Sequence, residues 1–94
     1  MSSKEIVAEK AFGKWLPEDV CYWKLMFIGV FGAPDRIILG DGYFYMIEWK
    51  REGKELRSSQ IFVHKILEKA GIHVHVCKTV LEAMNIHEME KLYL

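Results

Sequence analysis

The chain has 94 residues, which suit one small domain, and we expect a single domain over residues 1–94. Hydrophobic residues make up 51% and charged residues 28%, a balance that excludes an intrinsically disordered protein. The formal net charge of zero argues against a protein that coats nucleic acid, so any DNA contact must depend on a local patch.

The apolar segments are too short for a membrane span. The longest, residues 25–33, is well below the roughly 20 residues that cross a bilayer, and the chain starts with polar residues and no secretory core. Cys21 and Cys77 are too few for a disulfide framework, and we expect both to be reduced and partly buried. The sequence therefore predicts an intracellular, cytoplasmic protein without membrane contact.

The first half of the chain predicts a helix and then a strand. Residues 4–16 carry apolar side chains at helical spacing, and Pro17 helps to end the helix. Residues 20–28 are rich in aromatic and aliphatic types, as in a strand, and Gly29 begins a break in the chain.

A hairpin is predicted next. Asp41-Gly42 lies between two apolar runs, 35–40 and 43–50. This dipeptide favours a type I′ turn, in which both central residues have positive φ. We therefore expect two antiparallel strands joined by a two-residue turn.

The second half predicts a helix, a strand and a helix. A helix is expected over 58–70, with Ser58 or Ser59 as N-cap and Gly71 as terminator. Residues 72–77 alternate as in a strand, and the capping box Thr79–Glu82 opens a last helix. The order αβββαβα predicts the α/β (α+β) class, with a mixed sheet flanked by helices.

The predicted turn fixes which residues face each other. Residue 40 faces 43, and counting onward places Asp35 directly opposite Glu48, with both side chains on one face. Lys50 lies two residues beyond Glu48 and so shares that face. The rest of the face is an apolar floor made of Ile37, Leu39, Phe44 and Met46.

Two facing acids on an apolar face indicate a metal site. Like charges opposite each other are unfavourable, and burial increases the cost, but a divalent cation such as Mg²⁺ resolves the conflict. The backbone carbonyl of Trp49 could be a further ligand. Lys50 could orient or deprotonate a water, or donate to phosphate oxygens. The alternative is an exposed Glu48–Lys50 ion pair with no chemistry.

Basic and histidine side chains give further candidates. Residues 50–57 carry four positive and two negative charges, so Lys54 and Arg57 belong either to a phosphate-binding loop or to a solvated one. Lys24 and Arg36 are further candidates for phosphate contact. His64 follows Gln60 by four residues and could support the site, but a core or surface histidine is the favoured interpretation. His73 and His75 lack a nearby Cys or carboxylate at metal-ligand spacing. We therefore expect His73 and His75 to line the polar face of a strand.

Three short blocks resemble a known family. Gly32-Ala-Pro-Asp35-Arg36, Ile47-Glu48-Trp49-Lys50 and Gln60 resemble the VRR-NUC branch of the PD-(D/E)xK nuclease superfamily, over roughly residues 5–84. The resemblance implies a restriction-endonuclease-like core and phosphodiester hydrolysis that depends on Mg²⁺ or Mn²⁺. It also implies that Asp35 and Glu48 bind metal, that Lys50 is catalytic and that Gln60 supports the site.

The resemblance is strongest to the short stand-alone members of phages and bacteria. These act as homodimers on branched DNA such as four-way junctions. The family also uses a glutamate of the first helix, and between Glu5 and Glu9 we favour Glu9. The loop 29–32 departs from the family by lacking basic residues, so we expect apolar contacts there. The alternatives are a nickase or flap nuclease on forked or linear DNA, and a non-catalytic DNA-binding accessory module.

Overall fold

The computed structural model describes residues 3–93 and confirms the predicted order of elements. The elements are α1 (Ser3–Trp15), β1 (Cys21–Lys24), β2 (Arg36–Leu39), β3 (Phe44–Trp49), α2 (Ser58–Lys69), β4 (Val74–Cys77), α3 (Val80–Glu90) and the short 3₁₀ helix η1 (Lys91–Tyr93). Within this range, no helix is both long and apolar enough to cross a membrane.

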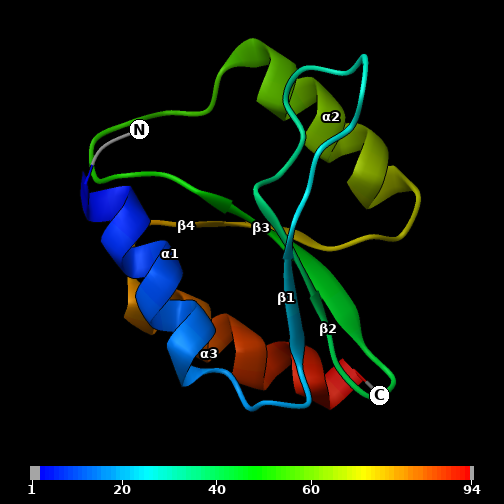
Figure 1. Ribbon diagram of the computed structural model, residues 1–94. Helices are drawn as coiled ribbons and strands as arrows, with labels where there is room; N and C mark the ends of the chain where they lie inside the picture. Colours follow the sequence, from blue (N-terminus) through cyan, green and yellow to red (C-terminus); the bar gives the residue numbers. More distant parts are fainter. Residues whose placement is uncertain (1–2, 94) are drawn as a thin grey trace.

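The four strands form one mixed sheet, in the order β1-β2-β3-β4. The first three strands are antiparallel, and β4 runs parallel to β3 at the edge. The parallel pair requires a crossover, which α2 provides. Figure 1 shows α2 on one face of the sheet and α1 and α3 on the other.

The hairpin has the predicted register but a different turn. β2 and β3 pair from Leu39↔Phe44 to Arg36↔Ile47, as the count from the turn predicts. Gly42 has a positive φ of 85°. Asp41 does not have a positive φ, because among the described residues only glycines do. The type I′ prediction is therefore wrong, although the two-residue turn still sets the pairing.

Asp35 lies just beyond the regular pairing. Its N–H donates to the Ile47 carbonyl at 3.0 Å, and Ile47 is already the partner of Arg36. Two residues thus oppose one, as at a β-bulge. The prediction that Asp35 lies directly opposite Glu48 is corrected by this shift at the end of the strand.

The main core lies on the face covered by α1 and α3. Its centre is formed by Ile38, Tyr45, Ile47 and Trp49 of the sheet, packed against Phe12 of α1. The opposite face, predicted as an apolar floor, is covered only in part: Met46 is buried, but Phe44 is 47% exposed. One helix covers this face, whereas two cover the other.

The first strand is shorter than predicted and ends at Lys24. Leu25 still donates to the Asp35 carbonyl, but the Val30 N–H then donates to the Phe27 carbonyl and closes a turn. The side chains of Met26, Ile28 and Phe31 are 83%, 92% and 88% exposed. We call residues 25–31 the apolar loop.

The helix ends show which local signals were sufficient. Thr79 caps α3 as predicted, accepting from the Glu82 N–H at 3.1 Å. The N-cap of α2 is Arg57 and not Ser58 or Ser59, and Gly71 ends this helix with a φ of 92°. Strand β4 begins at Val74, two residues later than predicted.

The cysteines also agree with the sequence. Cys77 is buried, Cys21 is half-buried, and both are free thiols.

Candidate active site

Two carboxyl groups meet where β3 ends. Glu48 is the second-last residue of β3 and is only 3% exposed. Asp35 lies in the loop that precedes β2. The Trp49 N–H donates to Oδ2 of Asp35 at 2.7 Å and holds this side chain beside the strand. The bulge at Asp35 therefore does not separate the acids. We call Asp35, Glu48 and Lys50 the acidic site.

The two acids perturb each other strongly. Burial, followed by the charge of Asp35, raises the pKa of Glu48 to about 8. Burial also raises the pKa of Asp35, against the hydrogen bond from the Trp49 N–H. A hydrogen bond between the carboxyl groups favours a protonated Glu48 and an ionised Asp35. In the absence of a cation, the pair holds a proton near neutral pH.

Helix α2 positions the carboxylate of Glu48. Gln60 is 4% exposed, and its Nε2 donates to Oε2 of Glu48 at 3.2 Å. Its Oε1 accepts the Arg57 N–H at 2.9 Å, so the amide of Gln60 is fixed at both ends. His64, one turn later, places Nε2 at 3.4 Å from Oε1 of Glu48, and burial lowers its pKa. Gln60, which was predicted to support the site, thus contacts Glu48, and so does His64, for which the sequence favoured a core or surface position.

The acids open into a cavity of about 270 Å³. Lys50 and Trp49 of the β3 end line it together with Arg57 of the α2 N-cap. The positive charge of Lys50 lowers the pKa of both acids, so the ammonium group acts on them directly. The remaining lining residues are Glu5, Gly32, Ala33, Asp35, Glu48 and Gln60. A cavity of this size holds several waters or a phosphate group.

Close packing of a loop on α2 brings the site together. Gly32 has a φ of 98°, and a Cβ added there would collide with the carbonyl of Ser59 in the first turn of α2. Only glycine allows this approach. The loop carrying Asp35 is thereby fixed against the helix carrying Gln60.

The first helix presents Glu5, not the favoured Glu9, to this cavity. Glu5 lines it and accepts the Arg51 N–H at 3.1 Å. Glu9 is buried in an ion pair with Arg36, in which Nε lies 2.6 Å from Oε2. The two glutamates are four residues apart on one helical face, so spacing alone could not separate them.

The basic candidates divide into surface and internal residues. Lys24 and Lys54 are exposed, and Arg57 lies at the cavity. Arg36 has a role inside the fold, because its guanidinium lies 4.3 Å from the centre of the Tyr22 ring and donates to the Tyr22 carbonyl at 3.1 Å. Arg36 is thus held by contacts within the fold, and its side chain is 16% exposed.

Comparison with known proteins places the fold. No family model matches the chain, and no curated protein matches it. A solved structure described as a VRR_NUC domain superposes with a TM-score of 0.81, covering 93% of this chain and 97% of that chain at 24% sequence identity. The chain has the VRR_NUC fold. The likeness extends over nearly all of both chains, and it confirms the predicted mixed α/β architecture.

Proposed function

We propose that this protein is a DNA endonuclease that hydrolyses phosphodiester bonds in branched DNA, depends on Mg²⁺ or Mn²⁺, and acts as a homodimer. The observation that carries the proposal is the buried pair of Asp35 and Glu48 beside Lys50, inside a cavity. The VRR_NUC fold supports it, because the motifs that resemble VRR-NUC nucleases lie together in the structure at this cavity.

The residues present fit a hard divalent cation. Two carboxylates converge in a buried position, where burial and the charge of Asp35 raise the pKa of Glu48, so a bound cation would offset the cost of ionising both groups. The ion would be held by Asp35, Glu48 and the carbonyl of Trp49, and Glu5 is the acid of the first helix that lines the cavity. When bound, Mg²⁺ or Mn²⁺ neutralises phosphate charge and makes a water more acidic.

The side chains of the chain supply the remaining functions. The ammonium group of Lys50 can donate to a phosphate oxygen or orient the attacking water. Gln60 and His64 restrict the rotation of Glu48 through their contacts with its two oxygens. Arg57 can bind a phosphate at the cavity, and Lys24 and Lys54 can bind the DNA backbone.

The exposed apolar loop supports a dimer. Exposed apolar side chains that lie close together in a chain mark an interaction surface, and Met26, Ile28 and Phe31 are each at least 83% exposed. A second copy would cover them and bring a second acidic site. Two sites in a symmetric dimer are what paired cleavage of a four-way junction requires.

Cleavage of defined DNA structures tests the proposal. Labelled four-way junctions, forks and plain duplexes are incubated with Mg²⁺, Mn²⁺ or EDTA, using the wild type and Glu48→Gln. We expect the wild type to cut the junction with metal only, and Glu48→Gln to be inactive. Cutting of forks or linear DNA alone would favour a nickase or flap nuclease. DNA binding without any cutting by a folded protein would favour the accessory module.

A further inference from the structure

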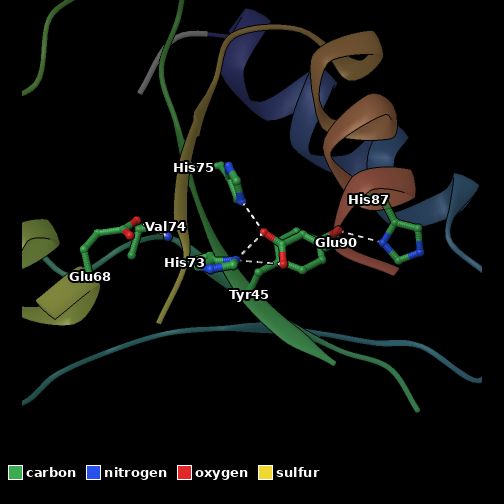
Figure 2. Close-up of polar contacts among 7 residues, drawn as sticks. All are labelled: Tyr45, Glu68, His73, Val74, His75, His87 and Glu90. Carbon is green, nitrogen blue, oxygen red and sulfur yellow. Dashed lines mark hydrogen bonds and ion pairs between the residues drawn. The ribbon is translucent and has the colours of Figure 1, made fainter. Parts of the chain in front are cut away.

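The structure brings two histidines and a glutamate together on the face of the sheet opposite the acidic site. His73 precedes β4 and His75 lies within it, and both point toward Glu90 at the end of α3 (Figure 2). His75 is the register partner of Ile47, whose side chain belongs to the main core, whereas Glu48 points to the other face. We call His73, His75 and Glu90 the His–Glu cluster.

We propose that the His–Glu cluster is a binding site for a first-row divalent transition metal ion, with Zn²⁺ as the expected ion. Its three potential ligand atoms all lie within 4.8 Å of one another. Nδ1 of His73 is 2.9 Å from Oε2 of Glu90, and Nε2 of His75 is 2.6 Å from the same oxygen. Both imidazoles thus converge on one carboxylate oxygen.

The geometry needs little change to accept an ion. Zn²⁺ binds imidazole nitrogen and carboxylate oxygen at about 2.0–2.2 Å, so tetrahedral neighbours lie about 3.3 Å apart. The nitrogen–oxygen distances in the cluster are slightly shorter than this. Binding would replace these hydrogen bonds and would bring the two imidazole nitrogens, which lie within 4.8 Å of each other, to the spacing of tetrahedral neighbours through side-chain rotation.

The donor set selects the class of metal. Two imidazole nitrogens and one carboxylate favour Zn²⁺ and similar ions over Mg²⁺, which prefers oxygen ligands alone. This separates the His–Glu cluster chemically from the acidic site, whose side-chain ligands are carboxylates.

Glu90 is held in place by burial, and the side of the cluster at His73 is open to a further ligand. Glu90 is 3% exposed, which holds its carboxylate in place, whereas the side chain of His73 is 43% exposed. A hollow of about 220 Å³, lined by His73, Glu90, Tyr43 and Phe44 among others, lies beside the cluster. Three protein ligands and an open side are the pattern of a site with an exchangeable fourth position.

The sequence could not indicate this site, because Glu90 lies 15 residues after His75 and approaches it only when α3 packs on the sheet. A bound ion would connect the end of α3 to the edge strand β4. It would act independently of phosphodiester cleavage at the other face.

Titration with Co²⁺, which reports its coordination through visible absorption, tests the site. The full chain carrying Asp35→Asn and Glu48→Gln removes the acidic site, and the wild type in excess Mg²⁺ serves as a second form in case that variant is unstable. We expect one equivalent of Co²⁺ to bind with the absorption of a four- or five-coordinate ion, and Zn²⁺ to displace it.

Matched variants decide which residues bind. His73→Gln, chosen because His73 is the most exposed ligand, should weaken Zn²⁺ binding about 100-fold or more, since loss of an outer-sphere partner already costs 10–100-fold. Glu90→Gln should do the same, and Glu88→Gln, an exposed glutamate on the same helix, should leave the affinity unchanged. Absence of Co²⁺ and Zn²⁺ binding in both forms, or equal affinity in His73→Gln, would overturn the proposal.

Discussion

Glu48 is held in the acidic site against an electrostatic cost, because it is buried beside a second carboxyl group. Its pKa rises from 4.5 to about 8 on folding, so the folded, metal-free protein binds a proton more tightly than the unfolded chain. The stabilisation from this proton is complete below about pH 4.5 and is lost as the pH rises toward 8. Metal-free protein should therefore become less stable across this range.

Glu48→Gln should remove this dependence. Glutamine is neutral and can keep a hydrogen bond from Gln60, so in EDTA at pH 8 the variant should be more stable than the wild type by about 1 kcal/mol or more, which is several degrees in Tm for a domain of this size. At pH 5 the difference should shrink. Thermal unfolding followed by circular dichroism at several pH values measures this, and parallel pH profiles would contradict the shifted pKa.

Glu5 and Glu9 should respond differently to the same substitution. Glu5→Gln changes a group at the cavity, so we expect reduced DNA cleavage with little change in stability. Glu9→Gln leaves the largely buried guanidinium of Arg36 without its ion-pair partner and should cost about 3 kcal/mol. Parallel assays of cleavage and thermal unfolding separate the two. A large loss of stability in Glu5→Gln would contradict this assignment.

At the level of elements, short sequence motifs predicted the parts of the fold that depend on residues close together in the chain. Asp41-Gly42 fixed the register of β2 and β3, and the Thr79–Glu82 box fixed the start of α3. The count from the turn also grouped Glu48 and Lys50 with Asp35, three of the residues at the cavity, although the bulge moves Asp35 out of the predicted register. These features need only a turn, a cap and alternation.

The features that the sequence did not predict depend on distant contacts. The end of β1 at Lys24 follows from the turn at Phe27–Val30, which the apolar composition of residues 25–31 conceals. The position of Glu5 at the cavity and of Glu9 beside Arg36 depends on a contact between residues 27 apart in the chain. The joining of His75 to Glu90 depends on how α3 packs. Periodicity within one element cannot report contacts of this kind.

The loop that carries Asp35 provides a test at this scale. Gly32→Ala adds a Cβ against the Ser59 carbonyl and also strains a positive φ, so it should cost about 2 kcal/mol or more and reduce cleavage. Gly53→Ala is the control, because its φ is also positive but its Cβ would meet nothing within 4 Å. That variant should lose only about 1 kcal/mol. Equal losses in thermal unfolding would contradict the close packing at Gly32.

At the level of the whole molecule, the sheet separates two regions with different tasks. One face carries the acidic site and α2, and the other carries the main core with α1 and α3 (Figure 1). The His–Glu cluster lies on the core side, at the edge strand. This division leaves the surface around the acidic site open for the DNA and the second copy proposed above, while the core remains closed.

The apolar loop should control the oligomeric state. Ile28→Glu with Phe31→Glu places charges where a second copy is proposed to pack, so the dimer should become an 11.0 kDa monomer with unchanged circular dichroism. Leu81→Glu with Met89→Glu, on exposed positions of α3, is the matched control and should remain dimeric. Light scattering measures the mass. A wild type that is itself monomeric would contradict the paired cleavage mechanism, and a dimeric loop variant would place the interface elsewhere.

The most direct test of the central claim is the single-turnover rate of four-way junction cleavage in Mg²⁺ by the wild type and Lys50→Ala. Removal of a group that assists the reacting water or the phosphate should slow cleavage about 100-fold or more, while junction affinity and thermal stability stay close to the wild type. Lys14→Ala, which removes the same charge from an exposed position of α1, should cleave at nearly the wild-type rate. Equal cleavage by the wild type and Lys50→Ala would contradict the assignment of the acidic site.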